Sequence, residues 1–180
     1  YHLGLGVPQD YAQALLWYRK AADQGEANAQ TNLGMMYANG QGVSRDYPQA
    51  ALWLRKAADQ SNALALTALG FLHEIGNGVP QDYRLAAQLY RKAADLGYDN
   101  AQTNLGVLYH NGRGVTKDYR EAANWFRKAA DQGEANAQSN LAFLYDLGNR
   151  GEPQDYGKAA FWYRKAADQG HPNAQTNLAF

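Results

Sequence analysis

The pentapeptide Arg-Lys-Ala-Ala-Asp recurs along the chain at a nearly constant interval. Its five copies occupy residues 19–23, 55–59, 91–95, 127–131 and 164–168. Successive copies lie 36, 36, 36 and 37 residues apart, and the additional residue falls near Gly148 to Pro153. A unit of this length cannot bury a hydrophobic face by itself, so it must stack on copies of itself. The period therefore predicts a solenoid with a long surface, an architecture more typical of binding than of catalysis.

The period divides the chain into four complete units flanked by two partial ones. The complete units are residues 27–62, 63–98, 99–134 and 135–171, and the partial units are residues 1–26 and 172–180. We expect residues 1–180 to form a single solenoid domain. The sequence starts mid-unit without Met and stops within a predicted helix, whereas solenoid ends normally carry polar capping units. We therefore expect it to be a fragment of a longer array.

The charge composition makes nucleic acid an unfavourable partner. Lys plus Arg and Asp plus Glu each number 17, and the calculated pI is about 7.1. No net field therefore attracts phosphate backbones or anionic lipid. Each Arg-Lys pair also lies close to an Asp of its own unit, which is typical of a solvated helix surface.

The absence of cysteine excludes disulfides, thiolate zinc sites and cysteine nucleophiles. It leaves both oxidising and reducing compartments possible. The longest apolar runs are far shorter than the roughly 20 residues that a membrane-spanning helix needs. We expect no membrane insertion.

Each unit has the pattern of two helices. In the unit 27–62, Ala29, Leu33, Met36 and Tyr37 recur at helical spacing and predict a first helix, here called helix A. The glycine-rich stretch 39–43 ends it, because glycine stops helices and permits positive φ. Asp46, with Gln49 three residues later, resembles a capping box and begins a second helix, helix B. No segment reads as a strand, so the fold class is all-α, with αα-hairpins as the repeating element.

Glycine recurs inside helix A at Gly34, Gly70 and Gly106. Glycine in a helix interior costs about 0.5 to 1 kcal/mol relative to alanine, so a repeated glycine implies a repeated structural gain. We expect that gain to be close approach of the helix-B tryptophans. These are Trp17, Trp53, Trp125 and Trp162.

The complete pattern is similar to a known repeat family. Ala-x-x-x-Leu-Gly-x-x-Tyr, Gly-x-Gly-Val, Asp-Tyr and Ala-x-x-Trp-Phe-Arg-Lys-Ala-Ala follow one another between Ala101 and Gly133. This frame, present along the whole chain, resembles the Sel-one-like repeat (SLR) family, relatives of tetratricopeptide repeats. The resemblance implies a right-handed superhelix with helix A on its concave face, and a non-enzymatic adaptor that binds a protein or peptide. It also favours, weakly, a bacterial cell-envelope or secreted location; compartment and oligomeric state are otherwise unassigned.

Two short segments resemble parts of catalytic or cofactor-binding motifs, but each is better explained by a structural role. Gly76-Asn77-Gly78 resembles the start of a dinucleotide fingerprint, but the preceding strand and the third glycine are missing. His73-Glu74 resembles the start of a zinc-protease motif, but Asn77 stands where the second histidine is required. His73 also shares a repeat position with Tyr37, Tyr109 and Tyr145. We therefore expect a packing role for His73 and predict no catalytic residue, cofactor or metal site.

The side of helix A opposite its apolar stripe is the candidate partner-binding face. The predicted contact residues there are Asn32, Met35, Asn104, Val107, Asn140 and Phe143. An asparagine side chain both donates and accepts, so a regular row could bind the backbone of an extended peptide. For Asn32, Asn104, Asn140 and Asn177, hydrogen bonding between repeats is an equal alternative. Asn28, Asn100, Asn136 and Asn173 are expected to cap helix A or tie the preceding connection.

The unit 63–98 departs from this row. Its corresponding positions are Leu64, Ala68, Phe71 and Ile75, an apolar stripe on a face expected to meet water. We interpret Leu64, Phe71 and Ile75 as a hydrophobic hot spot for a partner's helix or anchor side chain. The alternative is burial by the solenoid's own curvature or by flanking units.

Two other functions remain open from the sequence. One is carbohydrate or cell-wall (peptidoglycan) recognition, possibly with hydrolase activity, because some cysteine-rich relatives of the family have been linked to peptidoglycan or β-lactams; this chain lacks their cysteines. The other is a passive spacer between active domains.

Overall fold

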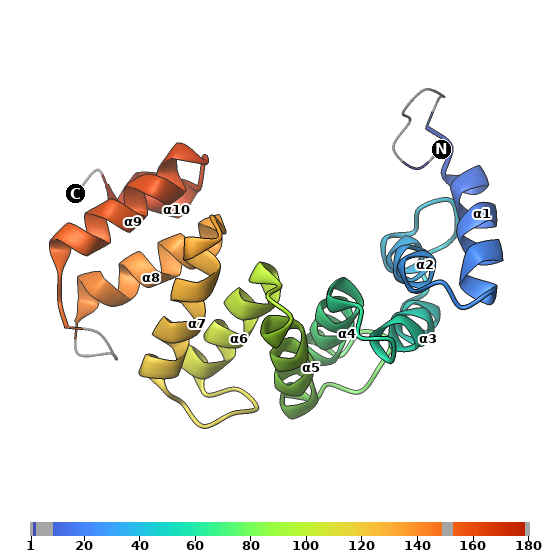
Figure 1. Ribbon diagram of the computed structural model, residues 1–180, viewed down its shortest axis with the longest axis horizontal. Coiled ribbons are helices and arrows are strands. Elements are labelled where there is room, and N and C mark those ends of the chain that lie inside the picture. The colour runs from blue at the N-terminus through green and yellow to red at the C-terminus, as the bar shows by residue number, and fades with distance from the viewer. Residues whose placement is uncertain (1, 3–8, 149–152, 179–180) are drawn as a thin grey trace. The chain divides into compact units, whose positions relative to one another are not determined.

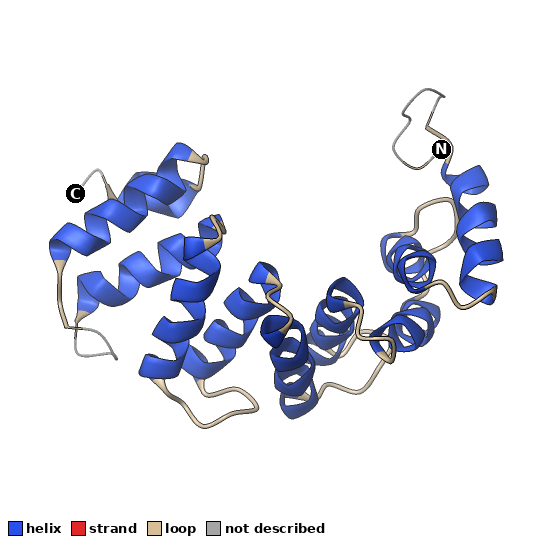
Figure 2. Ribbon diagram, in the orientation of Figure 1, coloured by secondary structure: helices blue, strands red, loops and turns tan. Residues whose placement is uncertain are grey.

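The computed structural model describes residue 2 and residues 9–148 and 153–178, which consist of helices and their connections (Figures 1 and 2). The segment Gly148 to Pro153, where the extra residue is expected, lies mostly outside the described residues. The described helices are α1 (Tyr11–Asp23), α2 (Ala27–Asn39), α3 (Tyr47–Ala58), α4 (Ala63–Ile75), α5 (Tyr83–Asp95), α6 (Asp99–Asn111), α7 (Tyr119–Asp131), α8 (Ala135–Leu147), α9 (Tyr156–Asp168) and α10 (Pro172–Asn177). No strand occurs in these residues.

Consecutive helices pack as αα-hairpins within two compact units, Tyr1–Ala93 and Ala94–Phe180. In the first unit α2 packs against α1 and α3, and α3 packs against α4. In the second unit α7 packs against α6 and α8, and α9 packs against α8 and α10. The even-numbered helices correspond to helix A and the odd-numbered ones to helix B, which confirms the all-α hairpin fold. The single array over residues 1–180 stays a prediction from the period.

Acidic side chains begin most of the helices. Asp46 caps α3 by accepting a hydrogen bond of 2.9 Å from the Gln49 backbone N–H, as the capping pattern predicted. Most copies of helix A are capped by the residue just before them. Glu26 accepts from the Ala29 N–H at 2.7 Å at the start of α2, whereas Tyr98 before α6 makes no side-chain cap. The prediction that Asn28, Asn100, Asn136 and Asn173 cap helix A was wrong, because these residues lie inside the first turn.

The other part of that expectation holds for two of these asparagines, which tie the helix to its connection. Asn136 Nδ2 donates to Glu134 Oε1 at 2.7 Å, and Asn28 makes the same contact with Glu26 at 3.5 Å. The amide therefore supports the capping carboxylate instead of replacing it.

The arginine of the recurrent pentapeptide joins one hairpin to the next. Arg127 Nη2, on α7, donates to the Tyr145 hydroxyl of α8 at 3.0 Å. Arg19, on α1, donates in the same way to Tyr37 of α2. Each bond runs from a helix B to the following helix A, so the tyrosine of the frame marks a contact between units.

The rest of the pentapeptide packs on its own helix or into the core. Lys128 Nζ lies 4.0 Å from the centroid of the Trp125 ring, a cation–π contact one turn apart. Ala129 and Ala130 are buried, and their small side chains let neighbouring helices approach closely. Asp131 ends α7 and is exposed.

The helix-A glycines face the residue after the tryptophan position, which Leu89 occupies in the unit 63–98. The expectation naming Trp17, Trp53, Trp125 and Trp162 was therefore wrong. The observed pairs are Gly34 with Leu54, Gly70 with Tyr90, and Gly106 with Phe126. A Cβ at Gly106 would lie only 2.6 Å from Phe126 Cε1. Consecutive helix residues point about 100° apart, so only one of the two adjacent large residues can face helix A. The tryptophans point in another direction, in which Trp53 and Trp125 are buried and Trp17 is 55% exposed.

Buried glutamines connect successive units, a feature that the sequence analysis missed. Gln138 of α8 is buried, and its Nε2 donates to the Ala130 carbonyl of the preceding helix at 3.3 Å. Its Oε1 accepts from Gln169 Nε2 at 2.9 Å, and Gln169 also donates to the Gly133 carbonyl at 3.0 Å. The glutamine pairs of this kind are Gln30 with Gln60, Gln102 with Gln132, and Gln138 with Gln169.

The glycine pair between helix A and helix B forms a structural turn, as expected. Gly78 has φ of 72°, and a Cβ there would lie 2.4 Å from the carbonyl carbon of Tyr47. The turn therefore crosses the start of the preceding helix B, α3, at a distance that only glycine allows.

We predict that Gly106→Leu lowers the free energy of unfolding by about 1 to 3 kcal/mol, because its side chain must displace the Phe126 ring. Urea denaturation followed by circular dichroism measures the change. Gly157→Leu is the matched control, since Gly157 is an exposed glycine inside α9 whose Cβ would meet only Asp155 Oδ1 at 3.4 Å. Equal losses in both variants would contradict the close-approach explanation.

We also predict that Ser61→Gly raises stability by about 0.5 kcal/mol, since a left-handed conformation is costly for any residue with a Cβ. Ser61 has φ of 62° and is the one non-glycine residue with positive φ in the described residues. The reciprocal change, Gly133→Ser, should lower stability by about 1 kcal/mol; Gly133 has φ of 98° and free space around its Cβ position. Thermal and urea denaturation report both changes, and a loss of stability in Ser61→Gly would refute the argument.

Candidate functional site

The nine predicted contact residues all lie in helix A, on faces only partly covered by packing. Asn32, Met35, Asn104, Val107 and Asn140 are half-buried, and Phe143 is exposed. Leu64, Phe71 and Ile75 are exposed on α4. They form separate groups in the two compact units, and each group is described by itself.

In the second unit the structure brings Val107, Asn140 and Phe143 together around one hollow. It has a volume of about 190 Å³ and lies where α6 and α8 flank the Phe126 ring of α7. His110 and Asn111 complete its lining, and Asn104 is not part of it. The hollow thus combines apolar walls with several hydrogen-bonding groups.

The asparagine amides of this face retain their hydrogen-bonding capacity. In the described part of the chain, no hydrogen bond engages the side chain of Asn32, Asn104 or Asn140. The hydrogen bonds between repeats are made instead by the buried glutamines, by Asn62 with Asn28 and by Thr103 with Glu134. A half-buried amide without a partner can bind a ligand's donor or acceptor at little cost.

The apolar stripe on α4 is exposed to solvent in the first unit. Leu64, Phe71 and Ile75 are 39%, 50% and 40% exposed. Ala68, between them, is half-buried. The other face of the same helix is buried through Leu66, Leu69 and Leu72. Helix α4 is therefore apolar on two sides but buried on only one of them.

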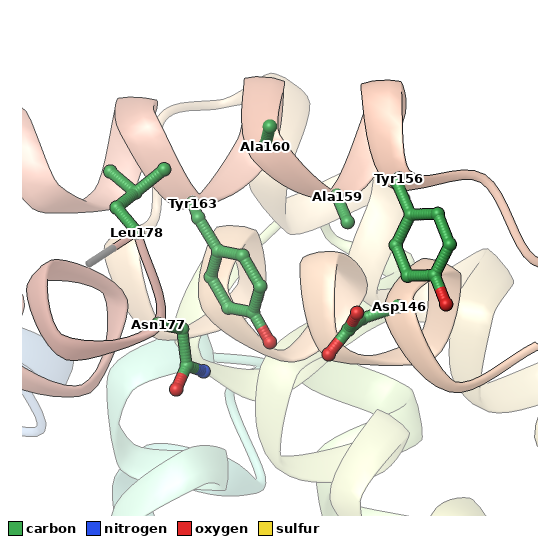
Figure 3. A pocket seen from close by; sticks show the side chains of 7 residues that line it. All are labelled: Asp146, Tyr156, Ala159, Ala160, Tyr163, Asn177 and Leu178. Atoms are coloured by element: carbon green, nitrogen blue, oxygen red, sulfur yellow. The ribbon is translucent and has the colours of Figure 1, made fainter. Parts of the chain in front are cut away.

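A second and larger hollow, of about 520 Å³, lies among α8, α9 and α10 (Figure 3). Its polar groups are Asp146, Tyr156, Tyr163 and Asn177, and its apolar lining is Ala159, Ala160 and Leu178. In Figure 3 the Tyr163 hydroxyl points toward the space between the Asn177 amide and the Asp146 carboxylate. Burial raises the pKa of Tyr163; the Asn177 side chain lowers it, and the charge of Asp146 raises it.

The two hollows occupy the same place in successive repeats. His110, Phe126 and Asn140 line the first, and Asp146, Tyr163 and Asn177 stand at the corresponding positions 36 or 37 residues later. The sequence analysis did not identify Asp146 or Tyr163. Comparison of these two positions across the repeats could have found the pair, because a tyrosine is combined with an acidic residue only in the unit 63–98, as Tyr90 with Glu74, and here, as Tyr163 with the shorter Asp146.

His73 is a buried packing residue, as its repeat position predicted. It is 5% exposed, and its Nδ1 lies 3.2 Å from the Pro80 carbonyl oxygen, to which it donates. Within the described residues no three histidine or acidic side chains cluster as metal ligands would. None of the described helices has both the length and the apolar character needed to cross a membrane.

Comparison with known proteins agrees with the repeat pattern. The Sel1 repeat family matches residues 1–26, 27–62, 63–98, 99–134 and 135–171. The comparison with curated protein sequences gave no significant match.

Several solved structures share the fold. A Sel1 repeat protein from Oxalobacter formigenes is 42% identical over 99% of this chain and 72% of its own, with a TM-score of 0.92. A protective antigen of uropathogenic Escherichia coli with an SLR fold is 40% identical over 99% of this chain, with a TM-score of 0.90. This chain spans 38% of that antigen's length.

A third, more distant structure is cysteine-rich protein B of Helicobacter pylori. It is 29% identical over 72% of this chain and 92% of its own, with a TM-score of 0.57. The family match covers most of the chain and agrees with the helical hairpins described above, so this protein belongs to the Sel1 repeat family.

Proposed function

We propose that this protein is a non-enzymatic adaptor whose helix-A face binds an extended segment of a partner protein. Sel1 repeat proteins are protein-interaction scaffolds. The observation that carries the proposal is the composition of the helix-A face: at repeated positions, amides with unused hydrogen-bonding capacity alternate with partly exposed apolar side chains. Such a face suits a peptide, which presents backbone amides and side chains in alternation.

The hollow between α6 and α8 supports this mode of binding. Asn140 can donate to a backbone carbonyl and accept from a backbone N–H of the same peptide. Val107 and Phe143 stand beside it and can cover an apolar side chain of that peptide. Backbone contacts would supply affinity without sequence preference, and the apolar walls would supply selectivity.

The exposed stripe of α4 supports a separate anchor point in the first unit. Leu64, Phe71 and Ile75 lie seven and four residues apart, so they share one face of the helix. Exposed apolar groups of this kind mark interaction sites when they are contiguous. We assign to this stripe an apolar anchor residue of the partner.

Cell-wall recognition has less support. The alternative drew on cysteine-rich relatives, and this chain has no cysteine. Glycoside hydrolysis generally uses two carboxyl groups about the scissile bond. Among the described residues, the lining of each hollow contains at most one carboxylate.

We predict that peptides selected from a random display library lose affinity when the helix-A amides are removed. Asn140→Ala should weaken binding about fivefold, the loss expected for one hydrogen bond of about 1 kcal/mol. Asn124→Ala is the matched control, because Asn124 is an exposed asparagine on α7, the helix B of the preceding hairpin. Isothermal titration calorimetry measures both affinities. Failure to select any peptide, or binding of peptidoglycan fragments in their place, would overturn the proposal.

A second prediction concerns the α4 stripe. The double change Phe71→Ala with Ile75→Ser should weaken a selected peptide that binds this unit by about tenfold or more, because truncating a central apolar anchor typically costs about 2 kcal/mol. Phe161→Ala with Leu52→Ser serves as the control, since these helix-B residues are similarly exposed at 52% and 46%. Fluorescence anisotropy with a labelled peptide gives the affinities. Unchanged affinity in a folded α4 variant would remove the stripe from the binding surface.

A further inference from the structure

We propose that the hollow among α8, α9 and α10 binds a lysine side chain of the partner segment, an inference that rests on the proposed function. The hollow presents a carboxylate, a buried hydroxyl and an amide above apolar walls. These groups come from Asp146, Tyr163 and Asn177.

The Tyr163 hydroxyl is buried without a hydrogen-bond partner. The residue is only 3% exposed, and among the described residues no donor or acceptor forms a hydrogen bond of good geometry with its oxygen, although the Asn177 side chain is near enough to lower the pKa of Tyr163. A buried polar group left without a partner costs about 1 to 3 kcal/mol, so such groups are usually satisfied by protein, water or ligand. This hydroxyl points toward the space between the Asn177 amide and the Asp146 carboxylate (Figure 3), but it is itself shielded from solvent, so a ligand group must enter between those two side chains to meet it.

The tyrosine at the same repeat position in the unit 63–98 does have a hydrogen-bond partner. Tyr90 donates to Glu74 Oε2 at 2.7 Å. Burial, that hydrogen bond and the charge of Glu74 all raise the pKa of Tyr90. Asp146 occupies the position of Glu74 but is shorter by one methylene, and no hydrogen bond joins it to Tyr163. The shortening leaves a gap between hydroxyl and carboxylate that a ligand group can fill.

An ammonium group fits this gap better than an anion or an amide does. It has three donors and no acceptor. The Asp146 carboxylate, the Tyr163 hydroxyl oxygen and the Asn177 carbonyl oxygen are three acceptors, because rotation of the asparagine amide can present its oxygen. The carboxylate supplies the opposite charge, and a charge-assisted hydrogen bond is about twice as strong as a neutral one.

The remaining walls fit the aliphatic part of a lysine. Ala159, Ala160 and Leu178 offer apolar contact for its four methylenes, and the Tyr156 ring stands at the edge of the hollow. The two lysines of α9 make contacts elsewhere, and Lys165 Nζ lies 4.8 Å from the centroid of the Phe161 ring. Lys158 Nζ lies 3.3 Å from Asp155 Oδ2 and 5.2 Å from the centroid of the Tyr145 ring.

The test uses nuclear magnetic resonance on the isotope-labelled chain with Nα-acetyl-lysine methylamide as the probe. We expect saturable shifts of the Tyr163 ring and the Asn177 amide, with a Kd of about 1 to 10 mM for a ligand of this size. The norleucine analogue, which has the stem without the ammonium, should bind at least about tenfold more weakly. Absence of saturable shifts, or equal binding of the norleucine analogue, overturns the proposal.

Two further probes separate the possible sources of the cation. n-Butylammonium reproduces the side chain alone, and Nα-acetyl-arginine methylamide replaces the ammonium by a guanidinium. Lysine binding at least as tight as n-butylammonium and tighter than arginine supports a peptide-borne lysine. Preference for the free amine or for arginine overturns it.

Substitution of Asp146 tests whether the probe binds in the space between the Asp146 carboxylate and the Tyr163 hydroxyl or is attracted only by the negative charge. Asp146→Glu keeps the charge but should let the longer carboxylate reach the Tyr163 hydroxyl, as Glu74 reaches Tyr90, and so weaken probe binding at least about fivefold. Tyr163→Phe should also weaken it, and this change is safe for folding because Phe126 holds the same repeat position. Binding unchanged in both variants overturns the proposal.

The outcome is independent of the peptide selection proposed above. If lysine binds but no peptide is selected on the helix-A face, the hollow stands and the adaptor function fails. If peptides bind and the lysine probe does not, only the present inference fails.

Discussion

The contact between a helix-A glycine and the large side chain of its own helix B sets the geometry of each hairpin. Gly34, Gly70 and Gly106 leave room for Leu54, Tyr90 and Phe126, which could not otherwise lie so close to the helix backbone. Packing at this distance covers the apolar stripe of both helices and leaves the opposite side of helix A only partly covered. The surface available for binding is therefore a consequence of the packing inside the hairpin.

Polar contacts then hold one hairpin against the next. The Arg–Tyr bonds connect residues 18 positions apart, and the glutamine pairs, each with one buried and one exposed member, connect residues about 30 positions apart. In the unit 63–98 both glutamine positions change together, to Leu66 and Leu96. The two positions change together because the buried glutamine, if kept without its partner, would have an amide oxygen with no hydrogen bond. The repeat thus tolerates a polar or an apolar pair at these positions.

The candidate sites arise where successive repeats keep the same backbone but differ in side chain. The hollow lined by His110, Phe126 and Asn140 recurs one repeat later with Asp146, Tyr163 and Asn177. The change converts an imidazole and an apolar ring into a carboxylate and a hydroxyl. A solenoid can in this way present a different chemical group in each repeat along one peptide-binding face.

The sequence by itself determined the period, the helical hairpins, the helix-B caps and the exposed stripe on α4, because these follow from local spacing and turn chemistry. It also predicted that Val107, Asn140 and Phe143 share a face. Only the tertiary structure decided that Glu26, and not Asn28, caps helix A, and that Leu54 and Phe126, and not the tryptophans, fill the space beside the glycines. Adjacent residues of a helix point in different directions and so contact different neighbouring helices. Those outcomes therefore depend on the exact position of each side chain and on which helix it meets. The Tyr163 hydroxyl lacks a partner because Asp146, on a different helix, is one methylene shorter than a glutamate. A local sequence pattern does not show this contact between helices.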